Sequence, residues 1–146
     1  MRIELKVPGN PTALKRHRSV RRGSFNVMYD PSEGDKADFL AKAMEVRPKV
    51  PFDCPLKVTL LFYFPRPKAH YRTGKYAGVL KPDAPFWHTK KPDIDNLTKF
   101  VFDALNGVYW RDDSIICWKE TVKQYTDIVP RVEVITEEIG NLLFER

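Results

Sequence analysis

The segment KKPDIDNLTKFVFDALNGVYWRDDSI, residues 90–115, combines a helical apolar pattern with a dense group of acidic residues. Apolar residues from Leu97 to Leu105 recur at the spacing of one helix face, and Gly107 is a typical helix stop. The pattern therefore predicts a helix over about residues 95–106. We expect the rest of the chain to support this segment.

Charged residues mark the start and the polar side of this predicted helix. Asp93 and Asp95 stand at its start, and Lys99 and Asp103 follow Asp95 at steps of four residues. One of the first two acids could simply cap the helix. The charged stripe could be an ordinary ladder of exposed ion pairs, which contributes little to stability. Both explanations stay open at this point.

A second acidic pair, Asp112-Asp113, follows the helix and precedes an apolar segment. One of these two could accept a hydrogen bond from a backbone N–H in a turn. Several carboxylates together, however, supply the hard oxygen ligands that Mg²⁺ or Mn²⁺ requires. If the following strand returns beside the helix start, three acids can converge on one ion. Lys99, paired with one of these acids in the absence of substrate, would then stabilise charge on a phosphate.

The flanking segments predict an α+β fold, and at this length the simplest arrangement is a single domain over residues 1–146. We expect a mixed sheet of about four or five strands with two main helices. The expected strands are residues 2–7, 56–64 as a central strand, and 115–125 with 131–136 as a hairpin-like pair, with a further short strand possible at 25–28; the expected helices are residues 35–47, 95–106 and a short one in 137–146.

A long connection, residues 65–91, is rich in proline, basic residues and aromatic residues. Such a composition suits contact with phosphates and unstacked bases. A surface excursion with no role explains the composition equally well. The sequence does not decide between these two interpretations.

Basic residues are concentrated between the first expected strand and the first expected helix. The formal net charge is +6, which favours a polyanionic partner, although net charge can also serve solubility alone. Acids clustered within a basic protein are what a metal-dependent phosphodiesterase needs. We therefore predict a DNA-binding segment, composed of Lys15, Arg16, Arg18, Arg21 and Arg22.

Other kinds of site find little support. Cys54 and Cys117 have no partners at zinc spacing, so we expect two reduced core residues. His17, His70 and His88 are scattered without a nucleophile arranged beside them, and no Gly-rich phosphate loop occurs. The N-terminus lacks an apolar signal segment and no apolar run could cross a membrane. We expect a cytoplasmic protein.

The segment KPDIDNLTKFVFDALNGVYWRDDSI resembles the signature of the RusA family of Holliday junction resolvases, a D-x-D-N-x-x-K helix followed by a W-x-D-D turn. The resemblance implies a RusA-like two-layer fold and a small homodimeric endonuclease, typically encoded by phages and prophages. Such an enzyme uses Mg²⁺ or Mn²⁺ to nick four-way DNA junctions symmetrically, in DNA recombination and repair. By position, it implies Asp93, Asp95 and Asp113 as metal ligands and Lys99 as the required lysine.

Two further functions remain open from the sequence. A related nuclease could use the same acids on flaps or other branched DNA. Alternatively, the chain could be a non-catalytic DNA-binding module whose acids serve only helix capping and turns.

Overall fold

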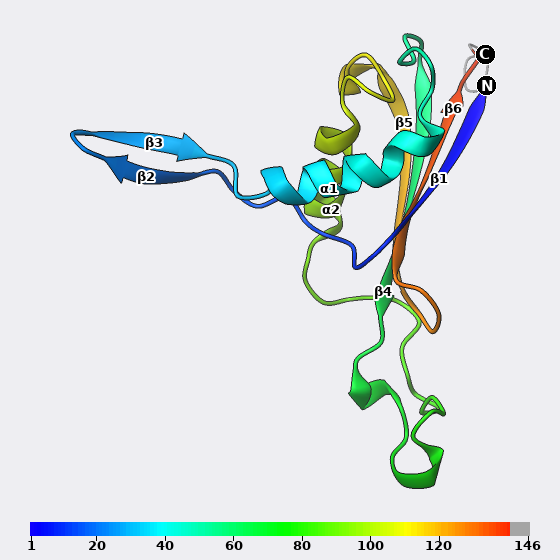
Figure 1. The fold of residues 1–146 in the computed structure, drawn as a ribbon. Coiled ribbons are helices and arrows are strands. Elements are labelled where there is room, and N and C mark those ends of the chain that lie inside the picture. Colours follow the sequence, from blue (N-terminus) through cyan, green and yellow to red (C-terminus); the bar gives the residue numbers. More distant parts are fainter. Residues whose placement is uncertain (141–146) are drawn as a thin grey trace.

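The computed structural model describes residues 1–140 and has the α+β architecture that the sequence predicts (Figure 1). A four-stranded mixed sheet is joined by a separate two-stranded hairpin and two helices. The elements are β1 (Arg2–Pro8), β2 (Arg18–Arg22), β3 (Phe25–Tyr29), α1 (Glu33–Ala43), β4 (Leu56–Pro65), α2 (Ile94–Leu105), β5 (Ile116–Thr126) and β6 (Arg131–Glu138). Short 3₁₀ turns are present at Met44–Val46, Lys68–His70, Gly74–Tyr76 and Asp113–Ile115.

The strand order of the main sheet is β1-β6-β4-β5. β4 is a central strand, as predicted, and is parallel to β5 and antiparallel to β6. The prediction that residues 115–125 and 131–136 form a hairpin-like pair is therefore wrong. The connection between β5 and β6 passes the end of β4, which separates the two strands and pairs with both.

One face of the sheet carries the core and is covered by α1 and α2, which lie on the same side of it in Figure 1. Alternate residues of β4, from Leu56 to Phe64, are buried on this face. Phe39 of α1 meets Phe100 of α2 edge to face, with ring centroids 5.8 Å apart. The α2 helix lies between β4 and β5 in the chain, so it serves as the crossover that a parallel strand pair requires.

Two excursions leave this body in different directions in Figure 1. The β2–β3 hairpin projects beyond α1, and every residue of both its strands is exposed. The predicted short strand at residues 25–28 is confirmed as β3, whereas its partner β2 was not predicted. The second excursion is the connection of residues 65–91.

Two smaller expectations also changed. Cys54 is half-buried but Cys117 lies exposed in β5, an edge strand, so the prediction of a core position is wrong for Cys117. The expected C-terminal helix begins in residues that belong to β6, and residues 141–146 lie outside the described part of the chain. Within residues 1–140 no helix is long and apolar enough to cross a membrane.

Candidate active site

The start of α2 presents two acidic side chains to solvent. Asp93 occupies the N-cap position with extended backbone, φ −68° and ψ 147°, yet its carboxylate accepts no capping hydrogen bond. Asp95 lies in the first turn and is exposed. Buried residues such as Leu97 and Val101 hold the opposite face of the helix against the sheet. Helix capping therefore does not account for either acid, although both suit the positive end of the helix dipole.

A cavity of about 320 Å³ lies between the polar side of α2 and the start of β5. Asp95, Lys99 and Asp103 approach it from the helix, and Asp113 and Lys119 approach it from the other side. The strand after the Asp pair thus returns beside the helix, which is the condition for these acids to converge. The remaining lining residues are Thr98 and Phe102.

The charged stripe of α2 does not form the ion-pair ladder that its spacing allowed. Asp103 instead faces Lys36 of α1, with the ammonium nitrogen 3.8 Å from its carboxylate, while Lys36 also pairs with Asp30 at 2.6 Å. Lys99 makes no ion pair with any carboxylate in the described part of the chain, so the prediction of an Asp partner for it is wrong. Its ammonium group is exposed beside the cavity.

The two acids of the turn have different environments. The Asp112 carboxylate accepts a hydrogen bond from the backbone N–H of Ser114 at 3.1 Å. The Ser114 side chain, followed by this backbone bond, lowers the pKa of Asp112. Asp113 begins the 3₁₀ turn and lines the cavity. Asp112 therefore stabilises the turn, which presents Asp113 to the cavity.

The chain before this turn is fixed by buried aromatic residues. Tyr109 and Trp110 are fully buried, and Phe52 pairs with this segment through two backbone hydrogen bonds, to Tyr109 at 2.9 Å and from Arg111 at 2.8 Å. The Tyr109 hydroxyl donates to the carbonyl of Ala43 at the end of α1, at 2.5 Å. These contacts place the Asp turn against the rest of the fold.

Lys123 of β5 connects this strand to the start of α2. Its ammonium group donates to the carbonyls of Lys90 and Pro92, both at 2.6 Å. Burial lowers the pKa of Lys123, whereas the nearby carboxylate of Asp93 opposes this effect. Asp93 is thus beside Lys123, and it does not line the cavity that contains Asp95 and Asp113.

Lys119 and Lys123 were not among the predicted site residues. Both lie on the side of β5 that faces the helices, since they pair with Val58 and Phe62 in the buried register of β4. Alternate residues of a strand share one face, so the expected strand over residues 115–125 already implied that residues 119, 121 and 123 lie on the same side.

The chemistry of these acids suits a divalent metal ion, but their positions in this structure suit it less well. Carboxylate oxygens are the ligands that Mg²⁺ and Mn²⁺ prefer. Asp95 and Asp113 share one cavity and are exposed, so both can turn toward an ion. Within residues 1–140, however, no three acidic, His or Cys side chains are grouped closely enough to hold a metal. Asp93 lies outside the cavity, so the three predicted ligands are not brought together in this structure.

The predicted DNA-binding residues lie on and just before the β2–β3 hairpin, which projects beyond α1 (Figure 1). Lys15 follows Leu14, whose N–H donates to the carbonyl of Asn96 in α2 at 3.0 Å. All five are exposed; they are Lys15, Arg16, Arg18, Arg21 and Arg22. In the hairpin register, Arg18 and Arg22 share a face with Phe25 and Tyr29. The hairpin therefore combines cations with exposed aromatic rings on one face.

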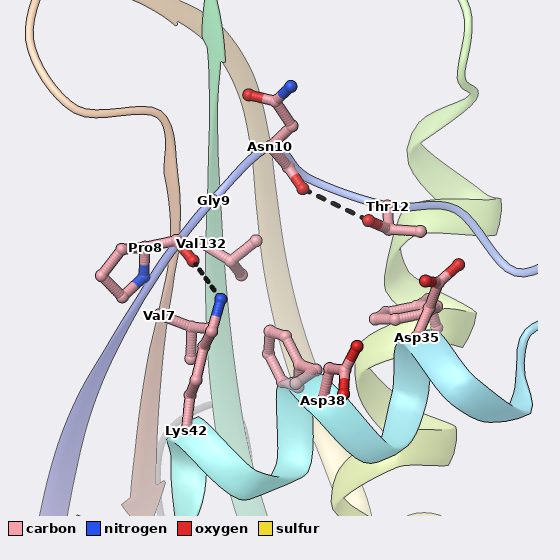
Figure 2. Close-up of a pocket in the computed structure, with 11 residues that line it drawn as sticks. Val7, Pro8, Gly9, Asn10, Thr12, Asp35, Asp38, Lys42 and Val132 are labelled. Atoms are coloured by element: carbon pink, nitrogen blue, oxygen red, sulfur yellow. Dashed lines mark hydrogen bonds between the residues drawn. The ribbon is translucent and has the colours of Figure 1, made fainter.

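A second hollow, of about 210 Å³, lies between the turn after β1 and helix α1 (Figure 2). Figure 2 shows Asp35 and Asp38 at its rim and Lys42 donating to the carbonyl of Pro8, at 3.2 Å. Gly9 follows with φ +122°, a conformation that favours glycine. This hollow contains none of the predicted site residues, and its lysine ties α1 to the end of β1.

Comparison with known proteins gives a consistent result. The family model described as Endodeoxyribonuclease RusA matches residues 8–137. An uncharacterized protein, YqaN of Bacillus subtilis (strain 168), is 34% identical over 146 residues, which covers 94% of this chain and 97% of that protein. The crossover junction endodeoxyribonuclease rusA of Lactococcus phage r1t is 31% identical over 114 residues, covering 76% of this chain and 77% of the phage protein.

Proposed function

Because the chain belongs to the RusA family of endodeoxyribonucleases, we propose that it is a metal-dependent nuclease that resolves four-way (Holliday) DNA junctions by paired, symmetrical nicks. The phage relative is named as a crossover junction endodeoxyribonuclease, which supports this substrate class. The observation that carries the proposal is the cavity where Asp95, Lys99 and Asp113 meet from α2 and from the turn before β5. We place its action on DNA in the cytoplasm.

In this proposal Asp93, Asp95 and Asp113 hold Mg²⁺ or Mn²⁺. The bound ion would polarise the scissile phosphate and lower the pKa of a water molecule. Asp95 and Asp113 are exposed on the same cavity, which supports their shared role. Asp93, two residues before Asp95, is the third ligand in this proposal. Lys123 holds the backbone beside it by donating to the carbonyl of Pro92.

Lys99 contributes a positive charge for the phosphate oxygens in this proposal. Because it makes no ion pair within the described residues, no carboxylate has to be displaced before it meets the substrate. A cation in such a position stabilises charge that develops during phosphodiester cleavage. Lys119, on the opposite side of the cavity, adds a second cation that lowers the repulsion between the acids and the DNA.

Cutting two opposed strands requires two sites, so we propose a homodimer whose symmetry supplies the second one. The basic residues Lys15, Arg16, Arg18, Arg21 and Arg22 would bind the backbone of the junction. The exposure of Arg18, Arg21 and Arg22 on a projecting element supports this contact.

The test is cleavage of a synthetic four-way junction, a flap and a linear duplex, each with and without Mg²⁺. We expect Mg²⁺-dependent paired nicks in the junction and little cutting of the other two. Preferential cutting of the flap would replace junction resolution with a nuclease for other branched DNA. Binding without any cutting, together with no Mg²⁺ binding by calorimetry, would identify a non-catalytic DNA-binding module.

A further inference from the structure

The connection of residues 65–91, which we call the 65–91 arm, is a folded projection. Near its tip the two halves of the arm pair with each other, with the N–H of Arg72 donating to Val79 at 2.8 Å and that of Lys81 donating to His70 at 2.9 Å. Two short 3₁₀ turns lie within it. The arm therefore presents its side chains from a defined backbone.

The root of the arm is attached to the sheet. Arg66, whose side chain is only 7% exposed, donates to the carboxylate of Asp127 and to the carbonyl of Pro85, both at 2.6 Å. The ring of His88 stacks on Phe64 at the end of β4, with centroids 3.9 Å apart. These contacts use Arg66 as a structural anchor and hold the arm in a fixed direction, so little ordering is required when a partner binds.

The outer part of the arm carries charge of one sign. Lys68, Arg72, Lys75 and Lys81 are exposed, and none of them forms an ion pair within residues 1–140. Lys68, Arg72 and Lys81 surround a hollow of about 480 Å³. Asp83 is the only acidic residue in the arm. Such unneutralised cations attract a polyanion, and they release counterions when they contact phosphates.

Aromatic rings accompany these cations. The ring of Tyr76 is approached by Arg72 and Lys75, at 4.4 and 5.3 Å from its centroid. Phe86 and Trp87, exposed by 54% and 58%, lie nearer the root, where the backbone of the arm pairs with the end of β5. Exposed rings beside cations are typical of surfaces that bind nucleic acid, because bases stack on the rings while the cations contact the backbone.

We propose that the 65–91 arm is a second DNA-binding element, distinct from the β2–β3 hairpin. The arm returns directly into α2, where Asp93 and Asp95 begin the candidate active site. The hairpin projects from the body in another direction (Figure 1). Two basic projections that diverge from one body match two DNA arms that diverge from a branch point. Each projection thus contacts a different duplex arm, an inference that rests on the proposed junction substrate.

The experiment compares two variants that lose the same charge. Lys68→Gln/Lys81→Gln removes two exposed tip lysines, and Lys6→Gln/Lys49→Gln removes two exposed lysines elsewhere in the molecule. None of the four ammonium groups has a bonding partner within residues 1–140, so both variants should fold, which thermal melting checks. Fluorescence anisotropy measures the affinity for a four-way junction in EDTA, over a range of salt concentrations and without cutting.

The salt dependence of binding gives the expected size of the effect. Each phosphate contact contributes about 0.9 to the slope of log affinity against log salt, so the tip variant should have a slope lower by about 1.8. The control variant should keep the wild-type slope. An unchanged slope in the tip variant, or an equal loss in both variants, overturns the inference. Binding is measured in EDTA and therefore does not depend on cutting. If the protein binds through the arm but never cuts, only the proposed nuclease function is refuted.

Discussion

The hydroxyl group of Tyr109 gives the sharpest test of how the Asp turn is held. Its side chain is fully buried, and it donates to the carbonyl of Ala43 at 2.5 Å. Tyr109→Phe keeps the ring and leaves this carbonyl without its donor. Loss of such a buried hydrogen bond costs about 1–2 kcal/mol, so we expect the free energy of unfolding to fall by that amount at pH 7.

The same residue predicts a distinct dependence on pH. Burial raises the pKa of Tyr109 from its usual 10.0 to about 12, although the nearby Arg47 opposes the effect. Above pH 10 the hydroxyl ionises in the unfolded chain but keeps its proton in the native protein. The contribution to stability is thus fully present below pH 10 and is lost as the pH rises through about 12. Since one pKa unit corresponds to about 1.4 kcal/mol, about that much stability is lost at pH 11.

Urea unfolding followed by tryptophan fluorescence at pH 7 and pH 11 checks both statements. The wild type and Tyr109→Phe should differ at pH 7 and nearly coincide at pH 11, because the variant cannot titrate at this position. Tyr76→Phe is the matched control, since the Tyr76 side chain is 45% exposed and its hydroxyl has no hydrogen bond within residues 1–140. Equal free energies of unfolding for wild type and Tyr109→Phe at pH 7 would refute the reasoning. A difference at pH 11 as large as the one at pH 7 would also refute it.

Three further predictions concern charged groups. Lys123→Met removes two hydrogen bonds to carbonyls that precede α2 and should lower stability by about 2 kcal/mol in urea unfolding; equal stability would contradict the assigned contacts. Lys99→Gln should leave stability unchanged but slow junction cleavage by about 100-fold or more, and normal rates would remove Lys99 from the mechanism. Replacing Arg16, Arg18 and Arg22 by Gln should lower the salt slope of junction binding by about 2.7, and an unchanged slope would exclude this basic segment from the DNA contact surface.

Local patterns predicted the elements of the fold well but not all of their partners. The alternation in Leu56–Pro65 and the helical spacing before Gly107 are properties of neighbouring residues, and both elements are present. Pairing between strands depends on residues far apart in the chain. The short connection from β5 to β6 favoured a hairpin, whereas β4 is apolar enough to take the position between them.

In the candidate site, too, local spacing was predictable and contacts between distant parts of the chain were not. The spacing of Asp95 and Lys99 placed both on one helix face, and the structure brings Asp113 to the same cavity. The partner of Asp103 was not predictable, because Lys36 belongs to another helix. Lys123 was missed since its hydrogen bonds go to backbone carbonyls, which no side-chain pattern reveals.

Cleavage and binding of a four-way junction by Asp113→Asn and Asp112→Asn test the central claim most directly. These neighbouring acids lose the same charge, but only Asp113 lines the cavity, whereas Asp112 accepts a hydrogen bond that asparagine can still accept. We predict that Asp113→Asn abolishes Mg²⁺-dependent cutting while it still binds the junction, and that Asp112→Asn cuts at a rate near that of the wild type. Normal cutting by Asp113→Asn, or loss of binding together with cutting, would contradict the role proposed for this acid.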